Sequence, residues 1–262
     1  MDRNQIFQHF STILDNMLQN SLFWDTFLQA PVGMNDAEGS IDDISFPENL
    51  HMRFGISRAC LIDDNYDYVV KFDMESDMYG DSLCQREVEL FDKAKANSLD
   101  NYFTEAVYLG TYQKTINFYK MTTIEHYIDW IDYDPAAFDL KFMNSEEKFG
   151  NIESITIQLP LYAYPRATAY SYTVFNIEDS VTLEEEARSL SSPLRKRGLQ
   201  LAMEFIYLYG MEQYEKLTKF LFEQEINDLH RGNVGCLNGR FVIIDFAGYH
   251  SESDEEEYTE DF

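Results

Sequence analysis

Two acids and one amide stand at spacings that suit the transfer of a phosphoryl group. Asp228 precedes Asn233 by five positions, and Asp245 ends the apolar run that follows. The segment 234–244 predicts a β-hairpin, because two apolar runs flank an Asn-Gly pair, which favours a tight turn. Such a hairpin folds Asp245 back beside Asn233. Phosphoryl transfer needs a carboxylate near the attacking hydroxyl and oxygen ligands that hold Mg²⁺ against the phosphates. We therefore expect Asp228 to be the catalytic base, and Asn233 and Asp245 to bind the metal.

The residues around this hairpin resemble those of the protein kinase-like superfamily. Its catalytic loop reads D-L-x-x-x-N, and its metal-binding acid follows a short hairpin as D-F-G. This sequence has Asp-Leu-His-Arg-Gly-Asn at 228–233 and Asp-Phe-Ala-Gly at 245–248. The first of these is also similar to the loop of aminoglycoside-phosphotransferase-like, ubiquinone-biosynthesis-type and phage-encoded kinase-like proteins. The resemblance implies a two-lobed α+β fold, with a β-rich first lobe and a reduced, mainly helical second lobe. It also implies ATP and Mg²⁺ as cofactors.

The upstream half of the chain supplies other parts of that pattern in the expected order. Tyr-Val-Val-Lys-Phe at 68–72 matches the V-A-I-K strand, so the resemblance assigns Lys71 to the α- and β-phosphates. A helix predicted over 82–96 follows, and it carries two acids that can pair with this lysine. Glu87 and Glu89 differ by about 200° around a helix, so only one of them can face it. We favour Glu87, because it shares a face with apolar residues, and Glu89 stays open as the alternative.

The segment that would cover the nucleotide departs from the superfamily pattern. In place of G-x-G-x-x-G it has a single glycine, Gly55, with Ser57 and Arg58 as substitute phosphate donors. The connection to the second lobe falls near Met121, whose backbone we expect to bind adenine. His230 stands where protein Ser/Thr kinases usually carry a lysine, and there it can contact the γ-phosphate or hold the loop by a hydrogen bond.

Hydrophobic periodicity predicts the elements that position these residues. The β-type runs lie at 58–62, 66–72, 106–109 and 116–121. Amphipathic helices are predicted over 5–28 (one or two helices), 124–131 and 199–222. The segment 132–192 fits no single pattern. We divide the chain into N-terminal helices and a loop (1–49), the first lobe (50–121), a reduced second lobe with the catalytic loop (122–250) and an acidic disordered tail (251–262).

Charge and composition restrict the partners. The chain has 262 residues, of which 45% are apolar, and it carries 20 Lys and Arg against 47 Asp and Glu, a formal net charge of −27. This charge repels nucleic acid and anionic membranes, so direct binding to either is not expected and a basic protein is favoured. Three widely spaced cysteines show no metal-ligand pattern, and no signal peptide or membrane span is evident. We expect a soluble, cytoplasmic protein.

Together these observations predict an atypical protein kinase that uses ATP and Mg²⁺ to phosphorylate Ser or Thr hydroxyls. A small-molecule acceptor and the transfer of AMP stay open. The alternative is a catalytically weak kinase-like binding module, or an acidic inhibitor, that engages a basic or nucleic-acid-binding partner. Because the sequence ends soon after Asp245, we expect any platform for the substrate to come from 122–225 or from the N-terminal helices.

Overall fold

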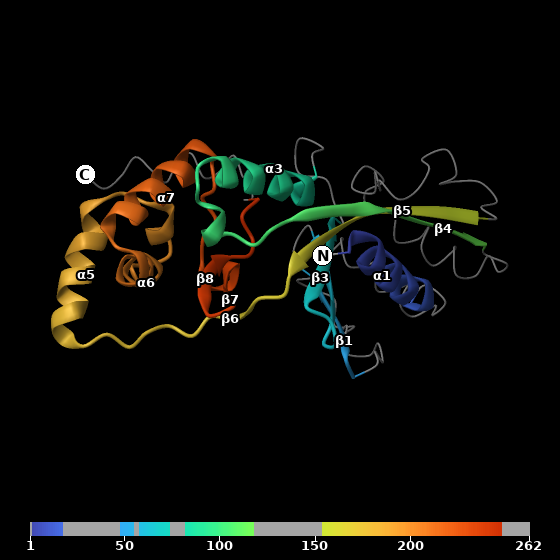
Figure 1. Ribbon diagram of the computed structural model, residues 1–262, viewed down its shortest axis with the longest axis horizontal. Helices are drawn as coiled ribbons and strands as arrows, with labels where there is room; N and C mark the ends of the chain where they lie inside the picture. The colour runs from blue at the N-terminus through green and yellow to red at the C-terminus, as the bar shows by residue number, and fades with distance from the viewer. Residues whose placement is uncertain (1, 18–47, 55–57, 74–81, 118–153, 248–262) are drawn as a thin grey trace, which may run out of the picture. The chain divides into compact units, whose positions relative to one another are not determined.

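The computed structural model describes residues 2–17, 48–54, 58–73, 82–117 and 154–247. Within these ranges the chain is mixed α and β, which is the coarse class that the sequence predicts (Figure 1). Its contacts divide it into two compact units, each built from two stretches of the chain. Unit 1 comprises Met1–Tyr79 and Val107–Ala163, and unit 2 comprises Gly80–Ala106 and Tyr164–Phe262.

A five-stranded sheet forms the centre of unit 1, with the strand order β1-β2-β3-β5-β4. Its strands are β1 (Leu50–Phe54), β2 (Arg58–Asp63), β3 (Tyr68–Asp73), β4 (Val107–Asn117) and β5 (Ser154–Pro165). Every second residue of β2 is buried, as expected for a strand with one face on the core. β2 and β3 pair in antiparallel register and confirm the strands predicted at 58–62 and 66–72.

β4 corrects the prediction of two short strands at 106–109 and 116–121, because 107–117 form one strand, and residues 118–121 lie outside the described part of the chain. It runs unbroken beside β5, and the register shifts between Tyr108 and Gly110. Gly110 has φ 147°, a conformation that other residues rarely adopt, and an added Cβ would lie 3.2 Å from the ring of Phe7. The glycine therefore accommodates a bulge inside one strand, where the sequence pattern suggested a break between two.

Helix α1 (Arg3–Met17) packs against β4. Its buried side chains recur at helical spacing, as the sequence predicts, and they are Ile6, Phe10, Ile13 and Leu14. Asp15 accepts hydrogen bonds from Lys114 at 2.7 Å and from Tyr112 at 2.8 Å. The hydrogen bond from Lys114 is the main cause that lowers the pKa of Asp15. Both apolar and polar contacts thus fix this helix on unit 1.

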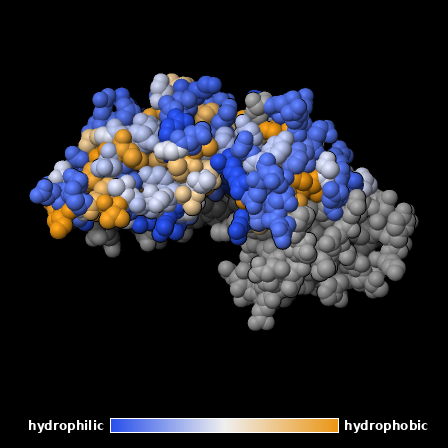
Figure 2. Space-filling model, turned by 60° about the horizontal axis from the view of Figure 1, so that its bottom comes forward, coloured by the Kyte–Doolittle hydropathy of each residue, from blue (hydrophilic) through white to orange (hydrophobic). Residues whose placement is uncertain are grey.

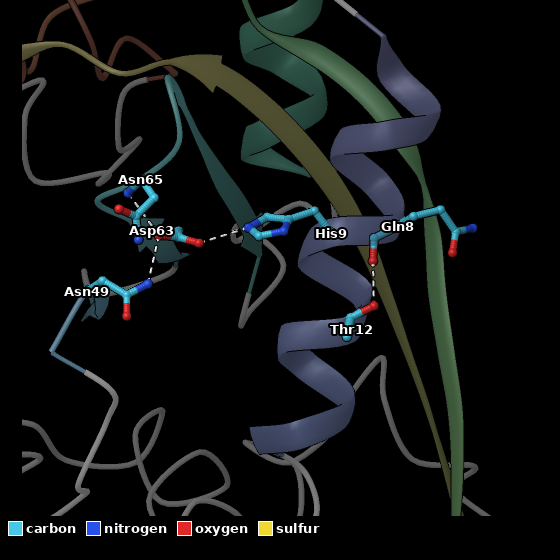
Figure 3. Close-up of polar contacts among 6 residues, drawn as sticks. All are labelled: Gln8, His9, Thr12, Asn49, Asp63 and Asn65. Atoms are coloured by element: carbon cyan, nitrogen blue, oxygen red, sulfur yellow. Dashed lines mark hydrogen bonds and ion pairs between the residues drawn. The ribbon is translucent and has the colours of Figure 1, made fainter.

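Asp63 fixes the same helix to the turn after β2 (Figure 3). Its buried carboxylate lies 2.9 Å from His9 Nε2, and it accepts hydrogen bonds at 2.9 Å from the Asn49 side chain and from the Asn65 backbone. Burial acts to raise the pKa of Asp63, but the hydrogen bonds from these three residues outweigh it, and the pKa lies below its ordinary value. The His9 ring also stacks on Tyr66, with centroids 4.3 Å apart.

Unit 2 is mainly helical. Its longer helices are α3 (Leu83–Ala96), α5 (Ile177–Ser189), α6 (Gln200–Tyr209) and α7 (Met211–Glu223), and its short 3-10 helices are η3 (Asp100–Tyr102), η5 (Pro193–Arg195) and η6 (Arg231–Asn233). A three-stranded sheet has the order β6 (Thr168–Ala169), β7 (Val234–Leu237) and β8 (Arg240–Ile243). Aromatic side chains from helices and sheet meet in one core, where Phe205 contacts Phe241 and Phe103 contacts Phe246.

The single helix predicted over 199–222 is instead two helices. Gly210 has φ 80°, which takes the chain out of the helical conformation, and it separates α6 from α7. The two helices then pack against each other. The apolar residues keep helical spacing across the break, and the sequence pattern therefore predicted one continuous helix.

The two units group the elements differently from the boundaries drawn on the sequence. Helix α3 belongs to unit 2, although the sequence division placed it within 50–121, and most of β5 belongs to unit 1, although it falls within 122–250. The helix predicted over 124–131 and the tail 251–262 lie outside the described residues. Within the described part of the chain, no helix combines the length and the apolar character needed to cross a membrane.

Candidate functional site

The hairpin of β7 and β8 brings Asn233 and Asp245 to the same end of a small sheet. Val234 pairs with Ile243, and the N–H of Ile244 donates to the carbonyl of Asn233 at 2.9 Å. Asn233 therefore precedes one strand at the point where Asp245 follows the other. The two turn residues, an Asn-Gly pair, have φ 53° and 77°. The hairpin predicted over 234–244 is confirmed.

The loop before the hairpin is closed by hydrogen bonds from Asn233. Its side-chain amide nitrogen donates to the carbonyl of Asp228 at 2.6 Å, and its backbone N–H donates to the carbonyl of His230 at 2.9 Å. Leu229 is fully buried and anchors the middle of the loop. Because the amide nitrogen is committed to the loop, the amide oxygen of Asn233 is the atom suited to a cation.

His230 holds the turn of this loop. Its Nδ1 accepts a hydrogen bond from the N–H of Gly232 at 3.0 Å and caps the short helix η6. An accepting Nδ1 carries no proton, so a neutral His230 has its proton on Nε2. The structure thus shows the structural role that the sequence left open for His230, and contact with a γ-phosphate stays a prediction.

Glu87 of α3 fixes the backbone immediately after Asp245. Its side chain is fully buried, and Oε1 accepts hydrogen bonds from the N–H of Phe246 at 2.9 Å and of Ala247 at 3.4 Å. Glu89, on the other side of the helix, is exposed and accepts a hydrogen bond from Gln85 at 3.2 Å. A buried carboxylate is tolerated only where donors satisfy it. Glu87 therefore connects α3 to the segment that carries the candidate metal ligand.

Arg197 contacts the candidate base, and the sequence analysis did not identify it. Its Nη2 lies 3.1 Å from Oδ1 of Asp228. The side chains are 60% and 33% exposed, so this ion pair faces solvent and adds little to stability. Arg197 ends the run Arg195-Lys196-Arg197, and three consecutive basic residues are conspicuous in a chain with 20 Lys and Arg against 47 acids. That run is the sequence signal that could have revealed it.

Aromatic and polar contacts hold the other side of the loop. The guanidinium of Arg231 lies over the ring of Tyr172, 5.4 Å from its centroid. The next residue, Thr173, donates from its hydroxyl at 2.6 Å to Glu204, a fully buried acid of α6. Tyr170 donates to the same carboxylate at 2.8 Å, and its pKa is raised by burial and by that hydrogen bond. The loop is thus supported by the segment 170–173, which we call the strap and which is itself fixed to α6.

The remaining candidates lie in unit 1 or outside the described residues. Lys71 is on β3, opposite Cys60 of β2, and Arg58 is the first residue of β2. Gly55, Ser57 and Met121 lie outside the described residues. Unit 2 contains five of the predicted site residues, which are Glu87, Asp228, His230, Asn233 and Asp245.

The donor set suits Mg²⁺ better than a metal held by protein alone. Among the described residues, no group of three or more His, Cys, Asp or Glu side chains is placed to hold a metal ion. Mg²⁺ needs no such group, because it keeps several waters and is commonly held by one or two side chains together with substrate phosphates. One carboxylate, from Asp245, and one amide oxygen, from Asn233, fit that mode of binding. No protein-family model matches this sequence, and no curated protein shows significant similarity to it.

Proposed function

We propose that this chain is an Mg²⁺-dependent ATP phosphotransferase with a two-lobed, kinase-like arrangement, and that it acts on Ser or Thr hydroxyls of proteins. One observation carries the proposal. Asn233 closes the loop that presents Asp228, and it meets the hairpin end that presents Asp245. In this proposal Asp228 takes the proton of the attacking hydroxyl, and the other two side chains hold Mg²⁺ against the phosphates.

The other residues have supporting roles. Lys71 neutralises phosphate charge, and Glu87 keeps Asp245 in place through its hydrogen bonds to Phe246 and Ala247. Gly55, Ser57, Arg58 and the backbone of Met121 complete the nucleotide site. His230 keeps the loop closed and lies beside the γ-phosphate. Local cations are needed here, because a chain with net charge −27 repels a nucleotide at long range.

A basic protein is the acceptor that the charge favours. Opposite charges raise the encounter rate of two proteins, and this effect weakens as salt is added. A chain of net charge −27 therefore collects basic proteins in preference to acidic ones. We expect histone-like or other Lys- and Arg-rich model substrates to be phosphorylated before acidic ones such as casein.

Labelled ATP tests the proposal directly. The full chain is incubated with Mg²⁺ and ATP that carries the label on the γ-phosphate or on the adenine, with and without basic protein. Label from the γ-phosphate on protein is the expected result, and Asp245→Asn should abolish it whereas the exposed Glu215→Gln should not. Label from adenine would replace phosphorylation by AMP transfer. If no label appears and ATP does not raise the melting temperature, the proposal is wrong.

A second candidate function is a kinase-like binding module, or an acidic inhibitor, without turnover. The ion pair between Arg197 and Asp228 favours it, because this pair occupies the carboxylate that a substrate hydroxyl would have to approach. The two functions differ in the effect of Arg197→Gln. An active kinase should change its turnover when the guanidinium is removed, whereas a binding module should show no turnover in either form and should bind basic or nucleic-acid-binding proteins without ATP.

A further inference from the structure

Three aliphatic side chains are exposed at the start of α5. Val174 is 95% exposed, Ile177 85% and Val181 54%, and we call these residues the α5 patch. Figure 2 shows hydrophobic residues gathered at the left end of the view, the end at which Figure 1 places α5. Single exposed aliphatic residues are common on proteins, but several together in one short segment mark a surface for interaction.

The α5 patch is not the face by which the helix packs on unit 2. That face carries Leu183 and Ala187, which are buried where α5 packs on α6. At about 100° per residue, Ile177 and Val181 share a different side of the helix. The helix therefore has two apolar faces, and only one of them is used within unit 2.

Acids border the α5 patch. On a helical projection, Glu178 and Glu185 lie along one flank of Ile177 and Val181, and Glu184 lies along the other. Arg188 donates to Glu184 at 2.8 Å, so the charge on that flank is balanced. Glu178 and Glu185 are exposed. The surface thus combines an apolar stripe with negative charge along one side.

The patch is also held ready for binding. Asn176 caps α5, because its side-chain oxygen accepts a hydrogen bond from the N–H of Asp179 at 2.8 Å. Before the cap, Thr173 is fixed to Glu204 of α6 through its N–H and its hydroxyl. A surface that is ordered before binding loses little conformational entropy when a partner arrives.

We propose that the α5 patch binds an amphipathic helix of a partner protein, one with apolar side chains at helical spacing and Lys or Arg along one flank. The apolar residues of such a helix cover Val174, Ile177 and Val181, and its cations meet Glu178 and Glu185. A second copy of this chain fits poorly, because two chains of net charge −27 would bring their acids together. The same charge opposes an anionic membrane. The patch is small, so the complex is weak and exchanges quickly.

This interaction does not depend on the proposed ATP chemistry, but the α5 patch lies close in sequence to a residue that contacts the loop of Asp228. Tyr172, which lies under Arg231 of the catalytic loop, is two residues before Val174. A partner on the α5 patch is therefore bound to the strap that supports that loop.

A defined probe tests the proposal on the full chain. The probe is a fluorescent synthetic helix with Leu at positions i, i+3, i+4 and i+7 and Lys on one flank, and its affinity is measured by anisotropy. Replacing both helix residues of the patch, as Ile177→Ser with Val181→Ser, should weaken binding by at least about tenfold. Removing the flanking charge, as Glu178→Gln with Glu185→Gln, should weaken it several-fold and reduce its dependence on salt.

Matched variants on α7 distinguish binding of the probe at the α5 patch from nonspecific attraction of the probe to other apolar or acidic side chains. Phe222→Ser removes another exposed apolar side chain, and Glu212→Gln with Glu215→Gln makes the same change in net charge at exposed positions. Both should bind the probe within about twofold of the unchanged chain. The proposal is overturned if the unchanged chain does not bind the probe, or if all the variants bind it equally. It is also overturned if the Ile177 and Val181 changes instead turn a dimer into a monomer, or abolish binding to anionic vesicles.

Discussion

Asp228 and Glu87, two acids of the candidate site, have different environments. Asp228 is partly exposed beside Arg197, as a group that contacts a substrate must be. Glu87 is buried in the core, where backbone N–H groups donate hydrogen bonds to its carboxylate. Asn233 uses its amide nitrogen inside the loop. The residues that would touch a ligand are thus held by residues that would not, which is the arrangement that a precise site requires.

Asp228→Asn separates chemistry from binding. The substitution keeps the size of the side chain and removes the charge that accepts a proton, so turnover should fall by about 10² to 10⁴. The rise in melting temperature caused by Mg²⁺ and ATP should stay near that of the unchanged chain. Asp92→Asn, at an exposed position of α3, is the control. Intact turnover, or a joint loss of turnover and nucleotide binding in a folded protein, would contradict the role given to Asp228.

Glu87→Ala should destabilise the chain far more than Glu89→Ala, although the two acids are neighbours on one helix. Loss of the buried carboxylate leaves the N–H groups of Phe246 and Ala247 without their acceptor, at a cost of about 1–3 kcal/mol for each buried donor. At the exposed Glu89 the change should stay within about 0.5 kcal/mol. Urea unfolding followed by circular dichroism gives both values, and equal effects would show that Glu87 does not hold this segment.

At the scale of elements, the local signals for the β7–β8 hairpin and for the start of α3 predicted the structure, whereas a bulge and a helix break were not predicted. The hairpin of β7 and β8 has its turn and both strands within 234–244, and the start of α3 has its cap in Ser82, whose side chain accepts from the N–H of Gln85. The bulge in β4 depends on its pairing with β5, which is distant in sequence, and its local mark is the single glycine Gly110. The division between α6 and α7 depends on the conformation of Gly210 in a segment whose apolar spacing is continuous.

Two substitutions at helix ends should have opposite effects. Gly210 and Glu225 both have positive φ, 80° and 55°. Gly210→Ala places a Cβ on a residue with positive φ and should lower the free energy of unfolding by about 1–2 kcal/mol. Glu225→Gly removes the Cβ from a residue with positive φ after α7 and should raise the free energy of unfolding by about 0.5–1 kcal/mol. Thermal unfolding of both variants measures the difference. If Gly210→Ala is neutral, the break between α6 and α7 is not set by the backbone conformation of this residue.

The attachment of α1 to the sheet should depend on pH through Asp63. Its pKa is lower in the folded chain than the ordinary value of 3.8, so its contribution to stability is present above that value and is lost as pH falls through the folded pKa. Asp63→Asn should therefore cost about 1–3 kcal/mol at pH 7, and the difference from the unchanged chain should shrink toward pH 3. Asp67→Asn, at an exposed position, is the control. A difference that does not change with pH would contradict this account.

At the scale of the molecule, the sequence predicted the local hairpin that connects Asn233 and Asp245, and it could not place candidate residues that are distant in sequence. Asp228, Asn233 and Asp245 lie within one short segment, so turn chemistry sufficed to bring them together. Lys71 belongs to unit 1, and local patterns do not say how one unit faces another. Arg197 was missed because its contact with Asp228 joins segments that are far apart in sequence.

Net charge makes one prediction for the whole chain, which is that nucleotide binding depends on Mg²⁺. ATP carries about four negative charges and meets a chain of net charge −27, so a divalent ion is needed to offset repulsion at Asp245. With ATP and Mg²⁺ at about 100 times the dissociation constant, stabilisation should be about 2.7 kcal/mol.

EDTA should remove this stabilisation, and Asp245→Ala should abolish it even in the presence of Mg²⁺. Lys71→Ala should reduce it, because the proposed function assigns this cation to the phosphates, whereas Lys216→Ala on α7 should leave it unchanged. The measurement is the melting temperature at fixed ionic strength, so that screening by added salt cannot imitate the effect of Mg²⁺. If ATP stabilises the chain equally with Mg²⁺ and with EDTA, then the carboxylate of Asp245 binds no metal and the catalytic assignment built on it fails.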